Sequence, residues 1–305
     1  MKGMIVFLVG PTAVGKSEIA GRLAKKINAE IVSCDSMQVY KGMDILTSQP
    51  PAPLKRMVSH HLIGLLSPER EYNVSAYRCQ AIEKIKQVLK KKKILLFVGG
   101  SGLYMSVLID GIFEGKVASS IRRALYQELE HYGPAYLYNR LQAVDPQAAG
   151  KIHPHDTKRV IRALEVFSAT GKTISSLQKE RKGLIDEGYT VKIFCLNMER
   201  EALYQRINAR VERMFRRGLV REVKKLSRRK LSKTAALAIG IRELGGYFDG
   251  QYDLAEAKQQ IQRNSRLYAK RQLTWFRKDK RINWINIGKL EKAQDIACRI
   301  KKELS

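Results

Sequence analysis

The sequence predicts an α/β protein: a P-loop-type parallel sheet with helices on both faces, plus a small all-helical insertion domain. Three observations predict this. Short apolar runs recur along the chain, helical patterns separate them, and a glycine-rich turn lies between the first run and the first helix. The runs are continuously apolar rather than alternating, which is typical of strands buried on both faces of a parallel sheet. Right-handed crossovers through the helices are therefore expected.

Five runs are predicted to be strands, at residues 4–9, 29–33, 93–98, 191–196 and 282–287. Apolar residues at helical spacing follow in several segments, which include residues 19–27, 74–89, 103–108 and 253–278. The carboxyl ends of parallel strands form the edge at which ligands bind. The residues that directly follow each run are therefore the candidates for a functional site.

The alternation of strands and helices breaks between residues 113 and 189. This span offers helical patterns at 119–133, 134–145 and 155–171, which Gly133-Pro134 and Asp145-Pro146 separate. We expect a helical insertion at 113–189 that interrupts a catalytic core made of residues 1–112 and 190–305.

Bulk composition narrows the class of protein. No apolar run among the 305 residues approaches the ~20 residues of a membrane span. The first run, Met4 to Val9, is too short for a signal peptide and is predicted to be a buried strand. The four cysteines are far apart and form no CxxC pair, so they are expected to be buried thiols rather than zinc ligands or disulfides. We expect a soluble, cytoplasmic, monomeric protein with no membrane partner.

Charge points to a partner. Lys and Arg total 57 against 29 Asp and Glu, for a formal net charge of +28. Such an excess favours a polyanionic partner, with nucleic acid as the first candidate and an anionic membrane surface as the second. A basic bias of the whole proteome is the remaining explanation.

The turn "GPTAVGKS" matches the P-loop pattern typical of nucleotide-binding and ATP-binding proteins. Gly10 and Gly15 let the backbone curl so that its N–H groups point inward at a phosphate. Lys16 adds a cation, and Ser17 can bind Mg²⁺. A strand before the turn and an amphipathic helix after it are the context that this motif requires.

An NTP hydrolase also needs an acidic residue at a later strand end. The run at 93–98 ends in Gly99, Gly100 and Ser101 instead, and the clean acid at a strand end is Asp35. Beside a bound diphosphate, Asp35 could accept a proton from an incoming nucleophile, which favours group transfer. Plain turn chemistry is the alternative for both Asp35 and Ser101.

Seven segments then resemble tRNA dimethylallyltransferases (tRNA isopentenyltransferases) of the bacterial type. They occur in that family's order over residues 4 to about 279: "GPTAVGKS", "DSMQVYKGMDI", "HHLIGLLSPEREYNVSAYR", "VGGSGLY", "DPQAAGKIHPHDTKRVIRALEV", "AIGIRE" and "RLYAKRQLTWFRKD". The resemblance implies transfer of a dimethylallyl group from dimethylallyl diphosphate to N6 of the adenosine 3′ of the anticodon. It implies Mg²⁺ as cofactor, pyrophosphate as product and the tRNA anticodon stem-loop as partner.

The resemblance also implies roles for residues. Asp35 is the expected general base, with Ser101 and Lys16 also catalytic, and Ser101 stands where the family usually has Thr. Diphosphate binding is expected of Gly10, Pro11, Thr12, Ala13, Val14, Gly15, Lys16, Ser17 and Arg242, with Ser17 on the metal. Contact with tRNA is expected of Asp35, Ser36, Met37, Gln38, Ser101, Arg122, Lys158, Arg159, Val160, Ile161 and Arg162.

The remaining charge fits an RNA partner. Arg263, Arg266 and Lys270 share one face of the predicted helix at 253–278, where they could follow a phosphate backbone. A flipped adenine would have to leave the anticodon stack to reach a buried base. For each charged helix taken alone, a solvated face is the better explanation.

Besides Ser101, the sequence departs from the family pattern at four positions: Leu46 replaces a glycine, Ser48 an alanine, Gln49 a lysine, and Gly64 an aspartate. These changes bear on tRNA affinity and on the geometry of the prenyl donor. Two other readings stay open, a P-loop kinase for a small molecule and a non-catalytic RNA-binding protein that retains the fold.

Overall fold

A computed structural model describes residues 2–113, 118–288 and 290–304 of the chain. The chain divides into two compact units, one of residues 1–109 with 184–305 and the other of residues 110–183. The sequence placed the insertion at 113–189, a few residues later at both ends. The first unit holds the sheet, and the second contains helices but no strand among its described residues.

The sheet is six-stranded, entirely parallel, and ordered β3-β2-β4-β1-β5-β6. Its strands are β1 (Met4–Val9), β2 (Ala29–Ser33), β3 (His60–His61), β4 (Ile94–Gly99), β5 (Thr190–Met198) and β6 (Ile282–Ile287). The predicted α/β class and the five predicted strands are confirmed. Strand β3 was not predicted, because its two histidines at the sheet edge form no apolar run.

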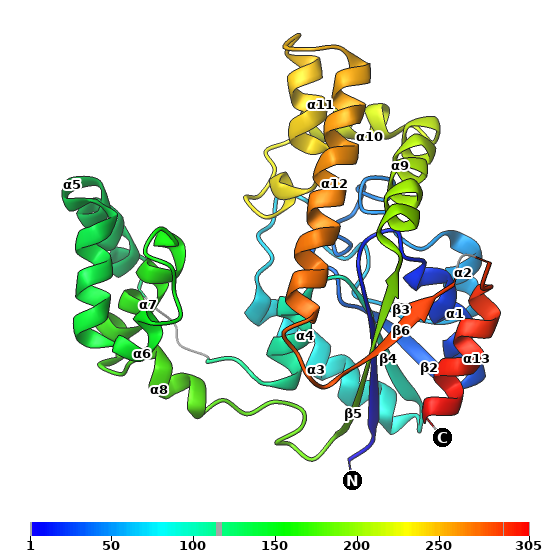
Figure 1. The fold of residues 1–305 in the computed structure, drawn as a ribbon, viewed down its shortest axis with the longest axis horizontal. Coiled ribbons are helices and arrows are strands. Elements are labelled where there is room, and N and C mark those ends of the chain that lie inside the picture. The colour runs from blue at the N-terminus through cyan, green and yellow to red at the C-terminus, as the bar shows by residue number, and fades with distance from the viewer. Residues whose placement is uncertain (1, 114–117, 289, 305) are drawn as a thin grey trace. The chain divides into compact units, whose positions relative to one another are not determined.

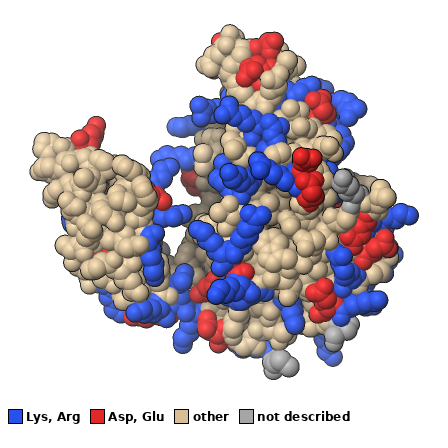
Figure 2. Space-filling view, viewed as in Figure 1, with Lys and Arg blue, Asp and Glu red and all other residues tan. Residues whose placement is uncertain are grey.

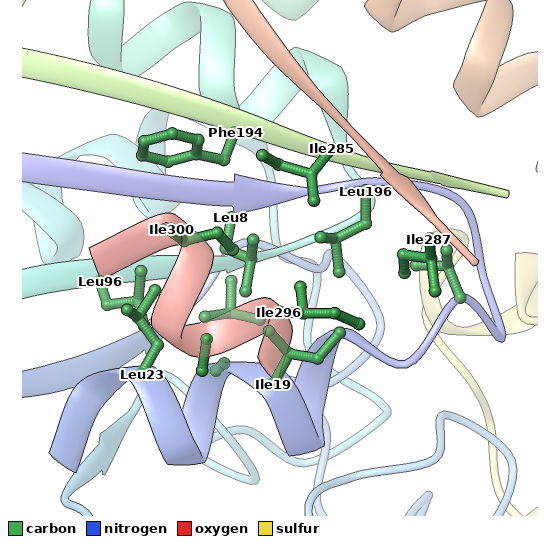
Figure 3. Packing of buried hydrophobic residues seen from close by; sticks show 14 of the residues in the cluster. Leu8, Ile19, Leu23, Leu96, Phe194, Leu196, Ile285, Ile287, Ile296 and Ile300 are labelled. Atoms are coloured by element: carbon green, nitrogen blue, oxygen red, sulfur yellow. The ribbon is translucent and has the colours of Figure 1, made fainter. Parts of the chain in front are cut away.

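Helices cover both faces of the sheet (Figure 1). On one face lie α1 (Lys16–Lys26) and α13 (Ala293–Leu304), whose apolar residues pack on alternate residues of the strands (Figure 3). Phe7 and Phe97 point to the opposite face, where their rings stack with centroids 4.9 Å apart. On that side lie α3 (Val74–Lys90) and α4 (Gly102–Ile109). Burial on both faces explains the unbroken apolar character of the strands.

A second helical group stands beyond the carboxyl ends of the strands (Figure 1). It consists of α9 (Arg200–Arg216), α10 (Leu219–Leu226), α11 (Ile241–Phe248) and α12 (Leu254–Phe276), with a 3-10 turn, η1, at Ala235–Leu237. The short helix α2 (Ala52–Met57) precedes β3. Because α9 follows β5 and α12 precedes β6, both helices begin or end next to strands of the sheet.

The second unit has its own small core. Its helices are α5 (Ser119–Val144), α6 (Pro146–Ala149), α7 (Thr157–Thr170) and α8 (Ile174–Lys179). Gly133 has non-helical backbone angles inside α5, so the predicted break at Gly133-Pro134 is a kink. Val160 and Ile161 are 1% and 2% exposed within this core. Their side chains pack within this core, and their expected contact with tRNA stays a prediction.

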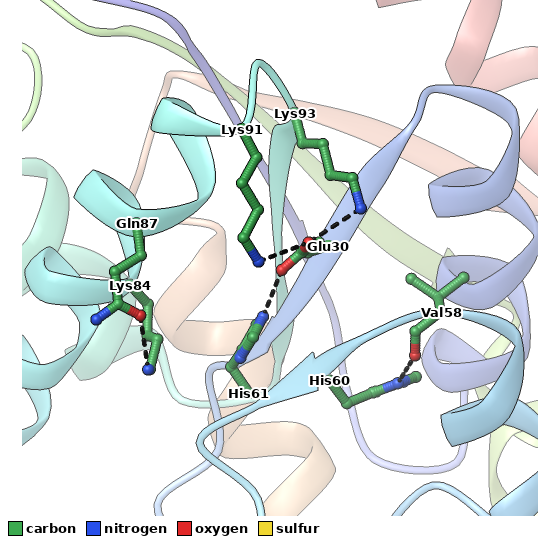
Figure 4. A network of polar contacts seen from close by, with 8 residues as sticks. All are labelled: Glu30, Val58, His60, His61, Lys84, Gln87, Lys91 and Lys93. Atoms are coloured by element: carbon green, nitrogen blue, oxygen red, sulfur yellow. Dashed lines mark hydrogen bonds and ion pairs between the residues drawn. The ribbon is translucent and has the colours of Figure 1, made fainter.

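A buried carboxylate near the start of β2 is hydrogen-bonded to one histidine and two lysines (Figure 4). Glu30 bonds the His61 ring at 2.7 Å and accepts hydrogen bonds from Lys93 at 3.0 Å and Lys91 at 3.3 Å. Burial alone would raise the pKa of Glu30, but these three partners lower it to about 2. The two lysines belong to a run of four at residues 90–93, so part of the excess positive charge of the chain is structural.

The cysteines depart from the prediction. Cys34 and Cys195 are buried thiols, but Cys79 is exposed and Cys298 is half-buried. Burial raises the pKa of both buried thiols to about 12. Among the residues described, no helix is both long enough and apolar enough to cross a membrane.

Candidate active site

Three neighbouring strand ends carry the predicted site. Val9 of β1 is paired with Gly99 of β4, and Ser33 of β2 is paired with Val98 of β4. The P-loop, the Gly99–Ser101 turn and Asp35 therefore leave the sheet side by side at its carboxyl edge. The backbone N–H of Ser101 donates to the carbonyl oxygen of Cys34 at 3.1 Å, which ties two of these ends together.

The P-loop has glycine where its shape demands glycine. Gly10 has a φ of +146°, and a Cβ there would lie 2.7 Å from the carbonyl oxygen of Leu196. Gly15 has a φ of +105° and caps the start of α1. The turn thus leads directly into the N-terminus of a helix, which suits an anionic group.

Lys16 is folded back onto this loop. Its ammonium donates to the carbonyl oxygens of Gly10 at 2.9 Å and Pro11 at 2.7 Å. Burial lowers the pKa of Lys16 to about 8, although the charge of Asp35 opposes that shift and the charge of Arg210 adds to it. Lys16 is therefore a desolvated cation that an anionic ligand would favour.

Asp35 and Ser101 both take part in turns, the alternative role that the sequence left open. The Asp35 carboxylate accepts a 2.9 Å bond from the backbone N–H of Met37. The Ser101 hydroxyl accepts a 3.4 Å bond from the backbone N–H of Tyr104, at the start of α4. These bonds fix the orientation of both side chains and are compatible with a chemical role.

Lys16, Ser17 and Asp35 line one pocket at the carboxyl edge of β2 and β4. Its remaining walls combine apolar and polar side chains: Ala20, Ile31, Ser33, Gln38, Pro50, His60, Ile63, Val98 and Gly99. Carboxylate, hydroxyl and ammonium groups thus meet beside an apolar surface. Within the described ranges, no three or more His, Cys, Asp or Glu side chains gather in a way that could hold a metal ion by themselves.

Helix α9 adds two arginines that the sequence analysis missed. Arg210 donates to the hydroxyl of Thr12 in the P-loop and, at 2.9 Å, to the hydroxyl of Ser48. Burial lowers the pKa of Arg210, although the Asp35 charge acts in the opposite direction. Arg206 donates to the carbonyl oxygen of Val14 at 3.3 Å. Nothing in the local sequence distinguishes these two from the other arginines of α9.

Helix α12 contributes Tyr268 and Gln272. Gln272 bonds the P-loop and the β4 turn at once, through Thr12 at 2.8 Å and Gly100 at 2.9 Å. Tyr268 is close enough to Asp35 for that charge to add to the effect of burial, and its pKa is raised above the usual range. Both residues lie within the segment "RLYAKRQLTWFRKD" that carries the family resemblance.

The loop after Asp35 is held from several sides. Gln38 accepts from the Ser33 hydroxyl at 3.0 Å, and Glu222 of α10 accepts the backbone N–H groups of Ile45 and Leu46 at 2.9 and 2.8 Å. Gln49, one of the family departures, is buried and donates to the carbonyl oxygens of Gln38 and Tyr40. This neutral residue braces the loop in place of the expected lysine.

The remaining basic residues with a predicted role are one arginine of the first unit and four side chains of the helical unit. Arg242 is exposed at the start of α11, and its contact with the diphosphate stays a prediction. In the helical unit, Arg122 and Arg162 both donate to the buried carboxylate of Glu165, at 2.7 and 2.9 Å. Lys158 and Arg159 are exposed on α7. In the first unit, Lys and Arg gather over α9, α10 and α12 (Figure 2).

Family models and known relatives both match most of this chain. A family described as "IPP transferase" matches residues 38–279, and one described as "Isopentenyl transferase" matches residues 3–62. The tRNA dimethylallyltransferase of Halothermothrix orenii is 42% identical over 288 residues, covering 93% of this chain and 88% of the relative. That of Bacillus subtilis is 43% identical over 289 residues, covering 94% and 91%.

Two solved structures share the fold. The tRNA isopentenylpyrophosphate transferase of Bacillus halodurans has a TM-score of 0.72 at 37% identity, covering 99% of this chain and 96% of its own. A eukaryotic dimethylallyltransferase acting on tRNA has a TM-score of 0.84 at 28% identity, covering 98% and 77%. With a family match over most of the chain and relatives above 40% identity, this chain belongs to the IPP transferase family.

Proposed function

We propose that this chain is a tRNA dimethylallyltransferase, which moves a dimethylallyl group from its diphosphate to N6 of the adenosine 3′ of the anticodon. The observation that carries the proposal is the meeting of the P-loop, Asp35 and Ser101 at three adjacent strand ends. Family membership supplies the reaction class, and this edge supplies groups suited to it.

The diphosphate of the donor would lie in the P-loop. Backbone N–H groups around Gly15 to Ser17, the Lys16 ammonium and the Arg210 guanidinium would bind the charge that develops on the leaving pyrophosphate. Lys16 already makes two hydrogen bonds to loop carbonyls, so it needs only to turn toward the ligand. The apolar walls of the adjoining pocket suit the five-carbon group.

The acceptor would enter from the side of Asp35 and Ser101. The N6 nitrogen attacks C1 of the dimethylallyl group, the C1–O bond breaks, and its electron pair leaves with pyrophosphate. Asp35 takes the proton that N6 loses. The Ser101 hydroxyl, held at the start of α4, would orient the amino group. An adenine must be flipped out of its stack to reach this position.

Magnesium fits the residues present. The Ser17 hydroxyl lines the pocket and is a hard oxygen ligand, as Mg²⁺ prefers, whereas the Asp35 carboxylate of the same pocket would stay free to take the proton from N6. The substrate's phosphate oxygens would complete the set, as is usual for this ion. Bound there, Mg²⁺ would neutralise charge on the diphosphate. Ser17 would hold the ion, and Lys16 and Arg210 would bind the diphosphate charge directly.

The tRNA would be recognised by basic side chains in both units. Lys158 and Arg159 on α7 and the cationic surface of α9, α10 and α12 are suited to phosphate contacts. Ser36, Met37 and Gln38, which follow Asp35, would contact the flipped nucleotide.

Mass spectrometry of an RNA product tests the proposal. The protein is incubated with Mg²⁺, dimethylallyl diphosphate and an anticodon stem-loop that carries adenosine 3′ of the anticodon. One dimethylallyl group per RNA, lost when that adenosine is replaced by guanosine, is expected. Unmodified RNA together with phosphorylation of a small molecule from ATP would instead identify a kinase.

A further inference from the structure

One face of α12 is directed at the strand ends of the active site. Tyr268, Gln272 and Trp275 are spaced four and three residues apart, so they project from the same side of the helix. Gln272 reaches the P-loop and the β4 turn, and the Trp275 ring lies against Gly102, the first residue of α4. Gln272, the middle residue of this face, is the one that hydrogen-bonds both the P-loop and the turn after β4.

Gln272 joins two backbone segments: the P-loop, which would bind the diphosphate of the donor, and the turn after β4, which carries Ser101 on the acceptor side. Its amide oxygen accepts from the backbone N–H of Thr12 at 2.8 Å, 260 residues away in sequence. Its amide nitrogen donates to the carbonyl oxygen of Gly100 at 2.9 Å. A donor on one side and an acceptor on the other fix the orientation of the amide, and no other uncharged side chain of this length matches both.

The bridge is buried and tightly fitted. Gln272 is 5% exposed, so a lost partner would leave an unsatisfied polar group. A Cβ added at Gly100 would lie 2.0 Å from the Gln272 amide nitrogen. The glycine before Ser101 is thus needed for the amide to reach its place.

We propose that Gln272 is a positioning residue that sets the spacing between the diphosphate cradle and the acceptor groups. Thr12 lies in the cradle, and Gly100 directly precedes Ser101, which is bonded to Cys34 beside Asp35. A shift of either segment would change the distance between the leaving group and the attacking nitrogen. Displacements of about 1 Å can cost ~10²-fold in rate. This inference rests on the proposed function.

The principal variant is Gln272→Met, which keeps the side-chain length and removes both hydrogen bonds. The matched control is Gln259→Met, an exposed glutamine on the same helix. We expect the single-turnover transfer rate of Gln272→Met at saturating donor and RNA to fall ~10- to 100-fold. RNA affinity should stay within about twofold, because Gln272 is buried away from solvent.

A double-variant cycle separates positioning from general stability. Gly100→Ala should expel the Gln272 amide, and therefore should slow transfer about as much as Gln272→Ala does. Combined with Gln272→Ala, it should add little further loss. Fully additive losses would mean that the two positions act independently, and would overturn the bridge.

Binding of Mg–pyrophosphate, measured by calorimetry, gives a readout that does not require transfer. Gln272→Met should weaken it at least ~5-fold, because the cradle is less well organised. If wild type binds pyrophosphate but prenylates nothing, the proposed function fails while this readout still decides the role of Gln272. A lower melting temperature with transfer and pyrophosphate binding both within twofold of wild type would show that Gln272 serves stability alone.

Discussion

The backbone N–H of Ser101 donates a 3.1 Å hydrogen bond to the carbonyl oxygen of Cys34. This one contact places a hydroxyl and the adjacent carboxylate of Asp35 on the same side of the P-loop, since β2 and β4 are neighbours and β4 also pairs with β1. The proposed chemistry depends on this adjacency, because the base and the leaving group must both reach the same substrate carbon and nitrogen.

The affinity for pyrophosphate should fall as the pH rises through about 8. Burial lowers the pKa of Lys16 from 10.5 to about 8, and an anionic ligand favours the protonated form. Calorimetry in buffers of different ionisation enthalpy should record proton uptake on binding between pH 8 and 9. Pyrophosphate has its own titration, so Lys16→Met is the reference; equal pH dependence in both proteins would contradict the assignment.

The same shift has a consequence for folding. Because the folded-state pKa of Lys16 lies below its unfolded value, the unfolded chain binds more protons between those two values. The contribution of Lys16 to the free energy of unfolding should therefore increase from about pH 8 to 10.5. In denaturant titrations over that range, the stability gap between wild type and Lys16→Met should shift in favour of wild type. A constant gap would indicate an unperturbed lysine.

Arg210→Met should raise the KM for dimethylallyl diphosphate ~10- to 100-fold, because it removes a charge-assisted bond of about 1.5–3 kcal/mol. Initial rates over a range of donor concentrations measure this. Arg213→Met, an exposed arginine on the same helix, is the control. If both variants had the same KM as wild type, Arg210 would serve only to hold Thr12 and Ser48.

Lys158→Ala and Arg159→Ala should each weaken binding of the stem-loop. Each should also reduce the slope of log K against log[salt] by about one, because one fewer counterion is released. Binding is measured by fluorescence anisotropy at several salt concentrations. Lys302→Ala, at the far end of α13, provides a basic control. An unchanged salt slope in both α7 variants would move the RNA site away from this helix.

Ile161→Ala should lower stability by ~2–5 kcal/mol, as for other buried isoleucines, without changing RNA affinity below the melting transition. Urea unfolding and anisotropy on the same samples distinguish the two effects. Weaker RNA binding by a protein that remains fully folded would instead show that Ile161 contacts the RNA.

Much of the fold could be predicted because parallel strands buried on both faces leave a strong signal. All five apolar runs are strands, and the P-loop lies between β1 and α1 as its motif requires. The edge strand β3 was not predicted, since two histidines carry no periodic pattern. The kink at Gly133 and the core role of Val160 depend on tertiary packing of the helical unit, which motif spacing does not report.

The parts of the site that could be predicted are those whose residues lie within a short sequence motif. Asp35, Ser101 and Lys16 follow strand ends, and strand order then brings them together. Arg210 and Gln272 were missed because they reach the P-loop from helices about 200 and 260 residues away in sequence. In a chain with 57 Lys and Arg, nothing local marks one arginine as the one that faces the cradle.

The most direct test of the account is the single-turnover rate of dimethylallyl transfer by Asp35→Asn. Asparagine keeps the oxygen that accepts from the Met37 N–H but cannot take a proton from N6. We expect a rate ~10²- to 10⁴-fold below wild type, with stem-loop affinity within about twofold. The control Asp249→Asn changes an exposed carboxylate directly after α11 and should leave the rate unaffected. A normal rate, or a loss of RNA binding that accounts for the whole defect, would contradict a general base at Asp35.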